Sequence, residues 1–137
     1  MKLSIPHIDK SDIRAINNVL KSERISTSSK TVDIFEEKLS SFCKTKYSVA
    51  LNSGTSAIHL GLKILGVDKT TEVIVPSLTF IATVNPILYL GAKPIIFDVD
   101  QYHNIRIEDV ISFIKKKTKF KNNKTINIKT KKIIKVI

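Results

Sequence analysis

Five small residues, Asn52, Ser53, Gly54, Thr55 and Ser56, separate two apolar runs of the chain. Gly54 allows a ligand to approach the backbone closely, and Thr55 and Ser56 add hydroxyl donors. The second apolar run has helical spacing, and the first N–H groups of a helix lack internal partners while its dipole makes that end positive. A phosphate oxygen accepting such N–H groups gains about 1.5–3 kcal/mol per charged hydrogen bond. The turn is therefore a candidate phosphate site.

Ordinary helix capping explains the same turn, because a Ser or Thr hydroxyl satisfies an orphan N–H at a helix start. The residues alone leave both interpretations open. The spacing does not match GxxxxGK[ST], which disfavours a nucleoside-triphosphate loop, and GxGxxG is absent, which disfavours the usual dinucleotide site.

Other residues with reactive side chains favour structural roles. Asp98 and Asp100 end an apolar strand, where a metal or acid–base role competes with the interpretation we prefer, polar residues at a strand end. His59 lies in an apolar helix, which indicates a hydrogen-bonded packing histidine rather than a base. His7 and His103 stand apart from other ligand-type residues, without the spacing of a metal site.

The single cysteine, Cys43, excludes an internal disulfide and is compatible with a reducing cytoplasm. It follows Phe42 in a predicted helix, so we expect a small buried side chain, with a catalytic thiol as the alternative. No run of eighteen uncharged apolar residues predicts a membrane span, and the first residues contain no secretory apolar segment. We expect a cytoplasmic protein without a membrane partner.

Positive charge is concentrated at one end of the chain. The net charge is +11, yet residues 115–137 hold ten lysines and no acidic residue, while residues 1–114 hold thirteen basic and twelve acidic residues. A local run argues for nucleic-acid binding more weakly than an evenly basic fold does. We interpret the segment as a solvated surface insertion, with a nucleic-acid arm as the alternative.

Periodicity and punctuation residues predict alternating helices and strands. Gly66 is expected to end the third helix and Pro86 to kink or restart the fourth. Helices are predicted at residues 11–22 (capped by Ser11), 31–42, 56–65, 79–90 and 107–116, with a loop at 26–29, and strands at residues 47–51, 72–75 (closed by Pro76), 94–99 and 131–137.

This alternation predicts an α/β fold with parallel strands joined by helical crossovers. The strands are continuously apolar, as expected when both faces of a sheet are covered. The last strand has no helix after it to cover the sheet, so we expect the 137 residues to be the front part of a larger protein.

The turn and the segments after it, NSGTSAIHLGLKILGV and EVIVPSLTFIATVNPILYLGAKPIIFDVD, together resemble the DegT/StrS-type sugar aminotransferases. The resemblance extends from IPHIDKSDI through FEEKLSSF to KKIIKVI. It implies the front part of the three-layer large domain of pyridoxal-phosphate enzymes with the aspartate-aminotransferase fold, with a mostly parallel sheet that is incomplete at the C-terminus. It divides the chain into N-terminal helices (1–45), a cofactor-binding core (46–114), and a basic insertion with a truncated strand (115–137).

The resemblance also implies functional roles. The turn at Gly54, Thr55 and Ser56 matches the loop whose backbone N–H groups, those of Thr55 and Ser56, bind the phosphate of pyridoxal 5′-phosphate. Phe80 matches the aromatic position that stacks on the pyridine ring, whereas without the family it would be interpreted as a core phenylalanine. Asn52 is expected to cap or brace the turn.

The family implies that a nucleotide-linked keto sugar receives an amino group, commonly from glutamate, in a homodimer, and that the cofactor serves as electron sink. Its Schiff-base lysine and the acid that pairs with the pyridine nitrogen are expected beyond residue 137, so this chain alone is expected to be inactive. Many members carry Gly-Pro where Ser28 and Ser29 stand, which weakens any expectation of a contact from that loop.

The residues leave two rival functions open. One is a sugar dehydratase of the same family, in which histidine replaces the lysine; the deciding position again lies beyond residue 137. The other is a non-catalytic basic binding module, which a salt-dependent nucleic-acid shift assay would reveal.

Overall fold

A computed structural model describes residues 5–23, 25 and 30–136 of the chain. The packing divides it into two compact units, Met1–Ala50 and Leu51–Ile137. Each unit is considered by itself. The predicted loop at residues 26–29, with Ser28 and Ser29, lies outside the described residues.

The N-terminal unit contains two helices, α1 (Lys10–Lys21) and α2 (Lys30–Cys43). Both were predicted within two residues of their ends, but the predicted cap of α1 is wrong. Asp9, not Ser11, is the N-cap: its carboxylate accepts the Ser11 and Asp12 N–H groups, and the Asp12 side chain accepts the Asp9 N–H. The Ser11 hydroxyl and these N–H groups hold the pKa of Asp9 below its ordinary value.

Neither helix buries a residue within the described part of the chain. The apolar residues that recur at helical spacing in α1 are exposed, at Ile13, Ile16 and Leu20. Cys43, at the end of α2, is also exposed, so the expectation of a buried cysteine is wrong. The physical reason is that a helix buries its apolar face only where another element packs on it.

The strand predicted at residues 47–51 is not formed. Instead, the Ala50 N–H donates to Glu36 Oε1 at 2.7 Å and the Ser48 hydroxyl donates to the Glu36 carbonyl. A strand needs a neighbouring strand to pair its backbone groups, and in the described residues this run contacts α2 through Glu36 rather than a strand.

The C-terminal unit is built around a five-stranded sheet with the order β2-β1-β5-β4-β3. β1 pairs in parallel with β2 and β5, whereas β4 pairs antiparallel with β5 and β3. The elements are α3 (Gly54–Ile64), β1 (Thr71–Pro76), α4 (Ile81–Tyr89), β2 (Lys93–Phe97), α5 (Ile107–Lys117), β3 (Thr118–Lys121), β4 (Lys124–Asn127) and β5 (Ile133–Val136).

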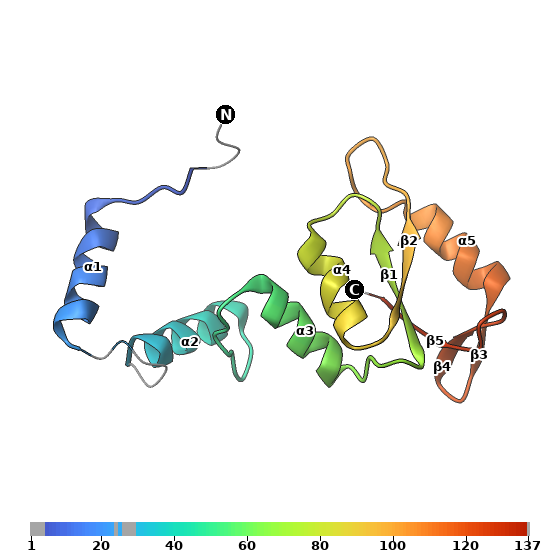
Figure 1. The fold of residues 1–137 in the computed structure, drawn as a ribbon, viewed down its shortest axis with the longest axis horizontal. Coiled ribbons are helices and arrows are strands. Elements are labelled where there is room, and N and C mark those ends of the chain that lie inside the picture. Colours follow the sequence, from blue (N-terminus) through green and yellow to red (C-terminus); the bar gives the residue numbers. More distant parts are fainter. Residues whose placement is uncertain (1–4, 24, 26–29, 137) are drawn as a thin grey trace. The chain divides into compact units, whose positions relative to one another are not determined.

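Helices cover both faces of this sheet, so the predicted three-layer α/β architecture is confirmed (Figure 1). Successive residues of a strand point to opposite faces. Val73 and Val75 of β1 accordingly pack with Leu62 of α3 and Ile87 of α4 on one face. On the other face, a second cluster joins Ile74 of β1, Val110 of α5 and Ile134 of β5.

The hairpin of β3 and β4 is absent from the sequence prediction, which treats this segment as a solvated insertion. Asn122 and Asn123 both adopt positive φ, 50° and 58°, and connect the paired residues Lys121 and Lys124. Two left-handed residues form the tight turn that suits a hairpin, and Asn tolerates that conformation. The Asn pair was the local signal for this turn.

Of two punctuation residues within the core, Gly66 confirms its prediction, and Pro86 does not start a new helix. Gly66 has φ of 72° and follows the C-cap of α3, as predicted. Pro86 does not restart the chain: α4 is a single helix that contains it, and its ring is buried beside Ile87. The burial of the ring offsets the one helical hydrogen bond that proline lacks.

Candidate functional site

The candidate site lies at the carboxyl ends of the parallel strands, where ligands of open α/β sheets bind. Figure 1 shows α3 and α4 running opposite to β1, so the first residues of both helices face that edge of the sheet. The two helices pack against each other through the core they share. The predicted residues Gly54, Thr55 and Ser56 open α3, and Phe80 immediately precedes α4.

Capping is present at the start of α3. Ser53 is the N-cap in an extended conformation, and its hydroxyl oxygen accepts the Ser56 N–H at 3.1 Å. The Ser53 hydroxyl donates to Ser56 Oγ at 3.0 Å, and Ser56 Oγ donates to Asn52 Oδ1 at 2.7 Å. The prediction that Asn52 braces the turn is confirmed. The Ser56 N–H, predicted to hold a phosphate, already has a partner here.

Two donors of the turn remain open. Among the residues that the structure describes, no protein acceptor pairs with the N–H of Gly54 or Thr55. A methyl group added to Gly54 would meet no heavy atom of the rest of the described chain within 4 Å, so the space on that side of Gly54 is open. Two free N–H groups and open space at the positive end of a helix suit a phosphate.

Phe80 offers an open aromatic ring at the start of α4. Phe80 is 79% exposed, so its ring is not part of the hydrophobic core of this chain. Phe80 is the N-cap residue of α4, and the Thr83 N–H donates to its carbonyl at 2.9 Å. A fixed backbone with an exposed ring is the arrangement that stacking on a flat ligand requires. Its stacking role remains a prediction.

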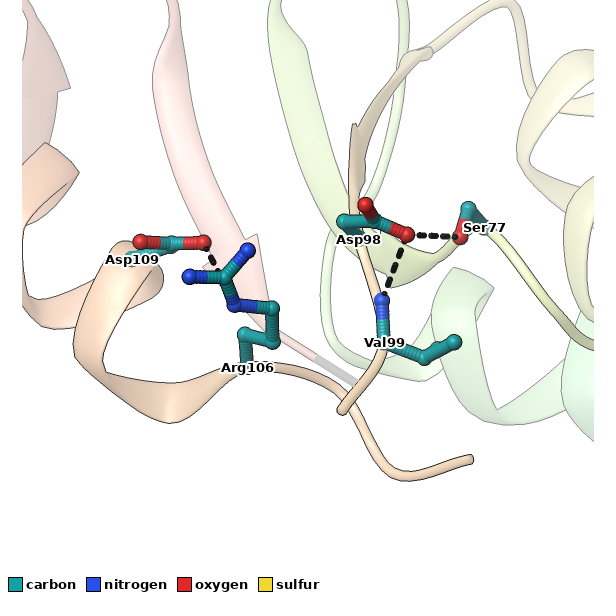
Figure 2. Close-up of polar contacts among 5 residues, drawn as sticks. All are labelled: Ser77, Asp98, Val99, Arg106 and Asp109. Atoms are coloured by element: carbon teal, nitrogen blue, oxygen red, sulfur yellow. Dashed lines mark hydrogen bonds and ion pairs between the residues drawn. The ribbon is translucent and has the colours of Figure 1, made fainter. Parts of the chain in front are cut away.

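Asp98 connects the ends of β1 and β2 beside this site (Figure 2). Its Oδ1 accepts the Val99 N–H at 2.8 Å and the Ser77 hydroxyl at 3.3 Å. Further along the same loop, Arg106 Nε lies 3.2 Å from Asp109 Oδ2. The sequence did not indicate the contact between Ser77 and Asp98, because only the parallel pairing of β1 and β2 brings these residues together.

Asp100 also has a structural role. Its Oδ1 accepts the N–H groups of Tyr102 and Asn104 at 2.9 and 3.0 Å, which closes the turn after β2. Both aspartates thus act as hydrogen-bonded residues at a strand end, as predicted. Within the described ranges, no group of three His, Cys, Asp or Glu side chains is placed to hold a metal ion.

His59 packs against α4 in the described structure. It is half-buried in α3, and its ring meets Tyr89 of α4 edge to face, with ring centroids 6.0 Å apart. This contact confirms the predicted packing, whereas the predicted hydrogen bond of the His59 ring is not formed among the described residues.

The turn at Asp68, which precedes β1, is also held by a carboxylate. The Thr70 hydroxyl and the Thr70 N–H both donate to Asp68 Oδ1, and these bonds hold the pKa of Asp68 below its ordinary value. Since β1 begins at Thr71, this turn lies at the opposite end of the strand from the candidate site.

The lysine-rich segment is folded but its charge is solvated. Eight of its ten lysines are exposed, while its backbone forms β3, β4 and β5.

A cavity of about 560 Å³ lies between the end of α5 and the β4–β5 connection, away from the candidate site. It is lined by Phe113, Lys116, Lys117, Asn127, Ile128 and Lys129. No helix among the described residues is long and apolar enough to cross a membrane.

Solved aminotransferases have the same fold as this chain. A putative sugar aminotransferase from Streptococcus pneumoniae in its PLP form matches with a TM-score of 0.72 and 32% identity, over 82% of this chain and 29% of that one. Its PMP form matches with a TM-score of 0.73. The fold class is therefore that of part of a pyridoxal-phosphate-dependent aminotransferase.

The particular family follows from the sequence match. Residues 6–135 match the model of the DegT/DnrJ/EryC1/StrS aminotransferase family, and the chain belongs to this family. It is 35% identical to GDP-perosamine synthase of Vibrio cholerae, over 83% of this chain and 31% of the relative. It is 42% identical to the UDP-4-amino-4-deoxy-L-arabinose--oxoglutarate aminotransferase of Shewanella sediminis, over 73% of this chain and 26% of the relative. The chain thus spans about a third or less of these relatives.

Proposed function

We propose that this chain forms the phosphate- and ring-binding part of the pyridoxal-phosphate site of an aminotransferase that acts on a nucleotide-linked keto sugar. The observation that carries the proposal is the pair of helix starts at one edge of the sheet. The start of α3 offers the free N–H groups of Gly54 and Thr55, and the start of α4 carries the exposed ring of Phe80.

Each residue has a distinct role in this proposal. The N–H groups of Gly54 and Thr55 bind the phosphate, and the dipole of α3 adds about 0.3–1 kcal/mol. The Ser56 N–H joins them when it exchanges the Ser53 hydroxyl for a phosphate oxygen. Phe80 holds the ring flat by stacking, which contributes about 0.5–1.5 kcal/mol. When bound, pyridoxal phosphate supplies the electron sink for amino transfer.

The proposed substrates follow from the relatives. One relative is named a GDP-perosamine synthase and another acts with oxoglutarate, according to its name. Oxoglutarate is the keto acid that glutamate leaves after losing its amino group, which supports glutamate as donor. We extend the proposal to a nucleotide-sugar acceptor, a homodimer and a cytoplasmic location.

We infer that the lysine that bonds covalently to the cofactor does not belong to this chain. None of the ten lysines in residues 115–137 stands in the sequence context of that family lysine. The chain therefore contributes binding and orientation but no turnover of its own.

Binding of pyridoxamine 5′-phosphate to the purified chain tests the proposal, because this form needs no covalent lysine. Fluorescence titration should show saturable binding, with inorganic phosphate as a competitor. Phe80→Ala should weaken binding about 2- to 12-fold, the equivalent of one lost stacking contact. Phe120→Ala is the matched control, since Phe120 on β3 is similarly exposed, at 73%, and should leave binding unchanged. Absence of binding to the wild-type chain, or equal losses in both variants, would refute the proposal.

A further inference from the structure

Residues 77–79 connect the end of β1 to Phe80 and are fixed at both ends. At the first end, the Ser77 N–H donates to the Phe97 carbonyl at 2.7 Å, which extends the pairing of β1 and β2 by one bond. At the second end, Thr79 Oγ1 and Thr83 Oγ1 are hydrogen-bonded at 2.8 Å. Phe80 lies directly after the segment between these two anchors.

Asp98 strengthens the first anchor from the neighbouring strand. Its Oδ1 accepts the Ser77 hydroxyl and the Val99 N–H, and Figure 2 shows these bonds meeting on one carboxylate oxygen. The Asp98 carbonyl accepts the Arg106 N–H at 3.0 Å. One residue therefore ties the end of β1, the end of β2 and the approach to α5.

The ring itself has no comparable support. Phe80 is 79% exposed, and its side chain makes no capping hydrogen bond to α4. The direction of such a ring depends on its backbone, since few side-chain contacts hold it. Movement of the segment would carry the ring with it, and misplacement of a binding group by about 1 Å is enough to lose a large part of its effect.

We propose that Asp98 and Ser77 are positioning residues for Phe80. The hydrogen bond between them holds residues 77–79 in place, so that the Phe80 ring lies flat against the cofactor heterocycle. This inference rests on the proposed function, because it needs a cofactor ring for Phe80 to stack on. Neither residue touches the cofactor in this account; both act through Phe80.

Four variants separate this role from a general structural one. Ser77→Ala removes only the hydroxyl donor, and Asp98→Ala removes the acceptor. Asp98→Asn keeps an oxygen at the same position and serves as the rescue variant. Asp100→Ala is the matched control, since Asp100 lies in the same loop and closes a turn without contacting Ser77.

Two probes distinguish the ring from the phosphate. Titration with pyridoxamine 5′-phosphate should show affinity reduced about 2- to 12-fold in Ser77→Ala and Asp98→Ala, the range of a stacking contact. Inorganic phosphate should bind these variants as it binds the wild type, because α3 is not involved. Asp98→Asn and Asp100→Ala should retain wild-type affinity for both probes.

A double-mutant cycle with Phe80→Ala provides the decisive readout. If Asp98 acts through the ring, Asp98→Ala should cause no further loss once Phe80 is replaced. Additive losses, equal losses for both probes, or unchanged affinity in Ser77→Ala and Asp98→Ala would overturn the inference while leaving the proposed function intact. Failure of the wild-type chain to bind pyridoxamine 5′-phosphate would overturn both.

Discussion

Replacing Ser53 by alanine should have opposite effects on stability and on anion affinity. The Ser53 hydroxyl caps α3 by accepting the Ser56 N–H at 3.1 Å. Loss of an N-cap costs about 0.5–2 kcal/mol of the free energy of unfolding. For about 1 kcal/mol, a chain of this size should lose roughly 3–5 °C in melting temperature.

Anion affinity should rise in the same variant. In the wild type a phosphate gains the Ser56 N–H only by displacing the Ser53 hydroxyl, and that neutral hydrogen bond is worth about 0.5–1.5 kcal/mol. In Ser53→Ala the donor is already free beside those of Gly54 and Thr55. The affinity for pyridoxamine 5′-phosphate should therefore increase by about 2- to 12-fold.

Thermal unfolding and calorimetric titration of the same samples test both effects. Ser53→Thr is the control, since it retains a hydroxyl and should leave stability and affinity close to wild type. A variant that is less stable with unchanged affinity would show that Ser53 only caps the helix and that the phosphate does not use the Ser56 N–H. Lower affinity would show that the Ser53 hydroxyl itself binds the ligand. Either result would refute the exchange we describe.

Three further predictions concern single residues of the C-terminal unit. Gly54→Ala should leave the melting temperature unchanged, since the added methyl meets no heavy atom of the rest of the described chain within 4 Å. It should reduce the affinity for phosphate about tenfold, because it weakens one charged hydrogen bond. Scanning calorimetry measures the melting temperature, and titration calorimetry measures the affinity. The pKa of Asp68 is lowered by its hydrogen bonds from Thr70, so these bonds stabilise the turn above about pH 4 and should lose that contribution as the pH falls through the lower folded-state pKa. The NMR chemical shift of the Thr70 amide, followed from about pH 6 to about pH 2, measures this loss. If the same pH-dependent change in chemical shift persisted in Asp68→Asn, the assignment to Asp68 would be contradicted. Asn127→Ala should reduce the free energy of unfolding, measured by urea denaturation, by about 1–3 kcal/mol. The reason is that it removes the 2.8 Å hydrogen bond from Asn127 to the carboxylate of Glu72, a residue that is only 1% exposed. A loss below about 0.5 kcal/mol would show that this hydrogen bond contributes little.

Much of the core could be predicted from local patterns. The apolar spacing of the sequence predicts α3, which follows the turn at residues 52–56, and α5, which precedes the last strands. Gly66 marks the end of α3 because its φ is positive. The resemblance to the sugar aminotransferases, carried by the SGTSA turn and the following segments, is confirmed by the family match. Such signals are local, because a few consecutive residues contain the periodicity and the turn chemistry.

Predictions failed where a residue's state depends on distant partners. The run at residues 47–51 has strand composition, but the Ala50 N–H donates to the Glu36 side chain and no strand is formed there. Cys43 has the type of a buried residue, but in the described chain nothing covers it. The hairpin at Asn122 and Asn123 joins the sheet through β5, which lies beyond it in the sequence.

The sequence by itself determined the order of the elements, the α/β class and the family, since periodicity, turn residues and motif are properties of neighbouring positions. Only the tertiary structure decided which donors of the turn are free, that Phe80 is exposed, and that Asp98 reaches Ser77 across twenty-one positions. The physical reason is that burial and hydrogen-bond competition are set by packing. In this chain, parallel pairing of β1 and β2 brings those residues to one edge of the sheet.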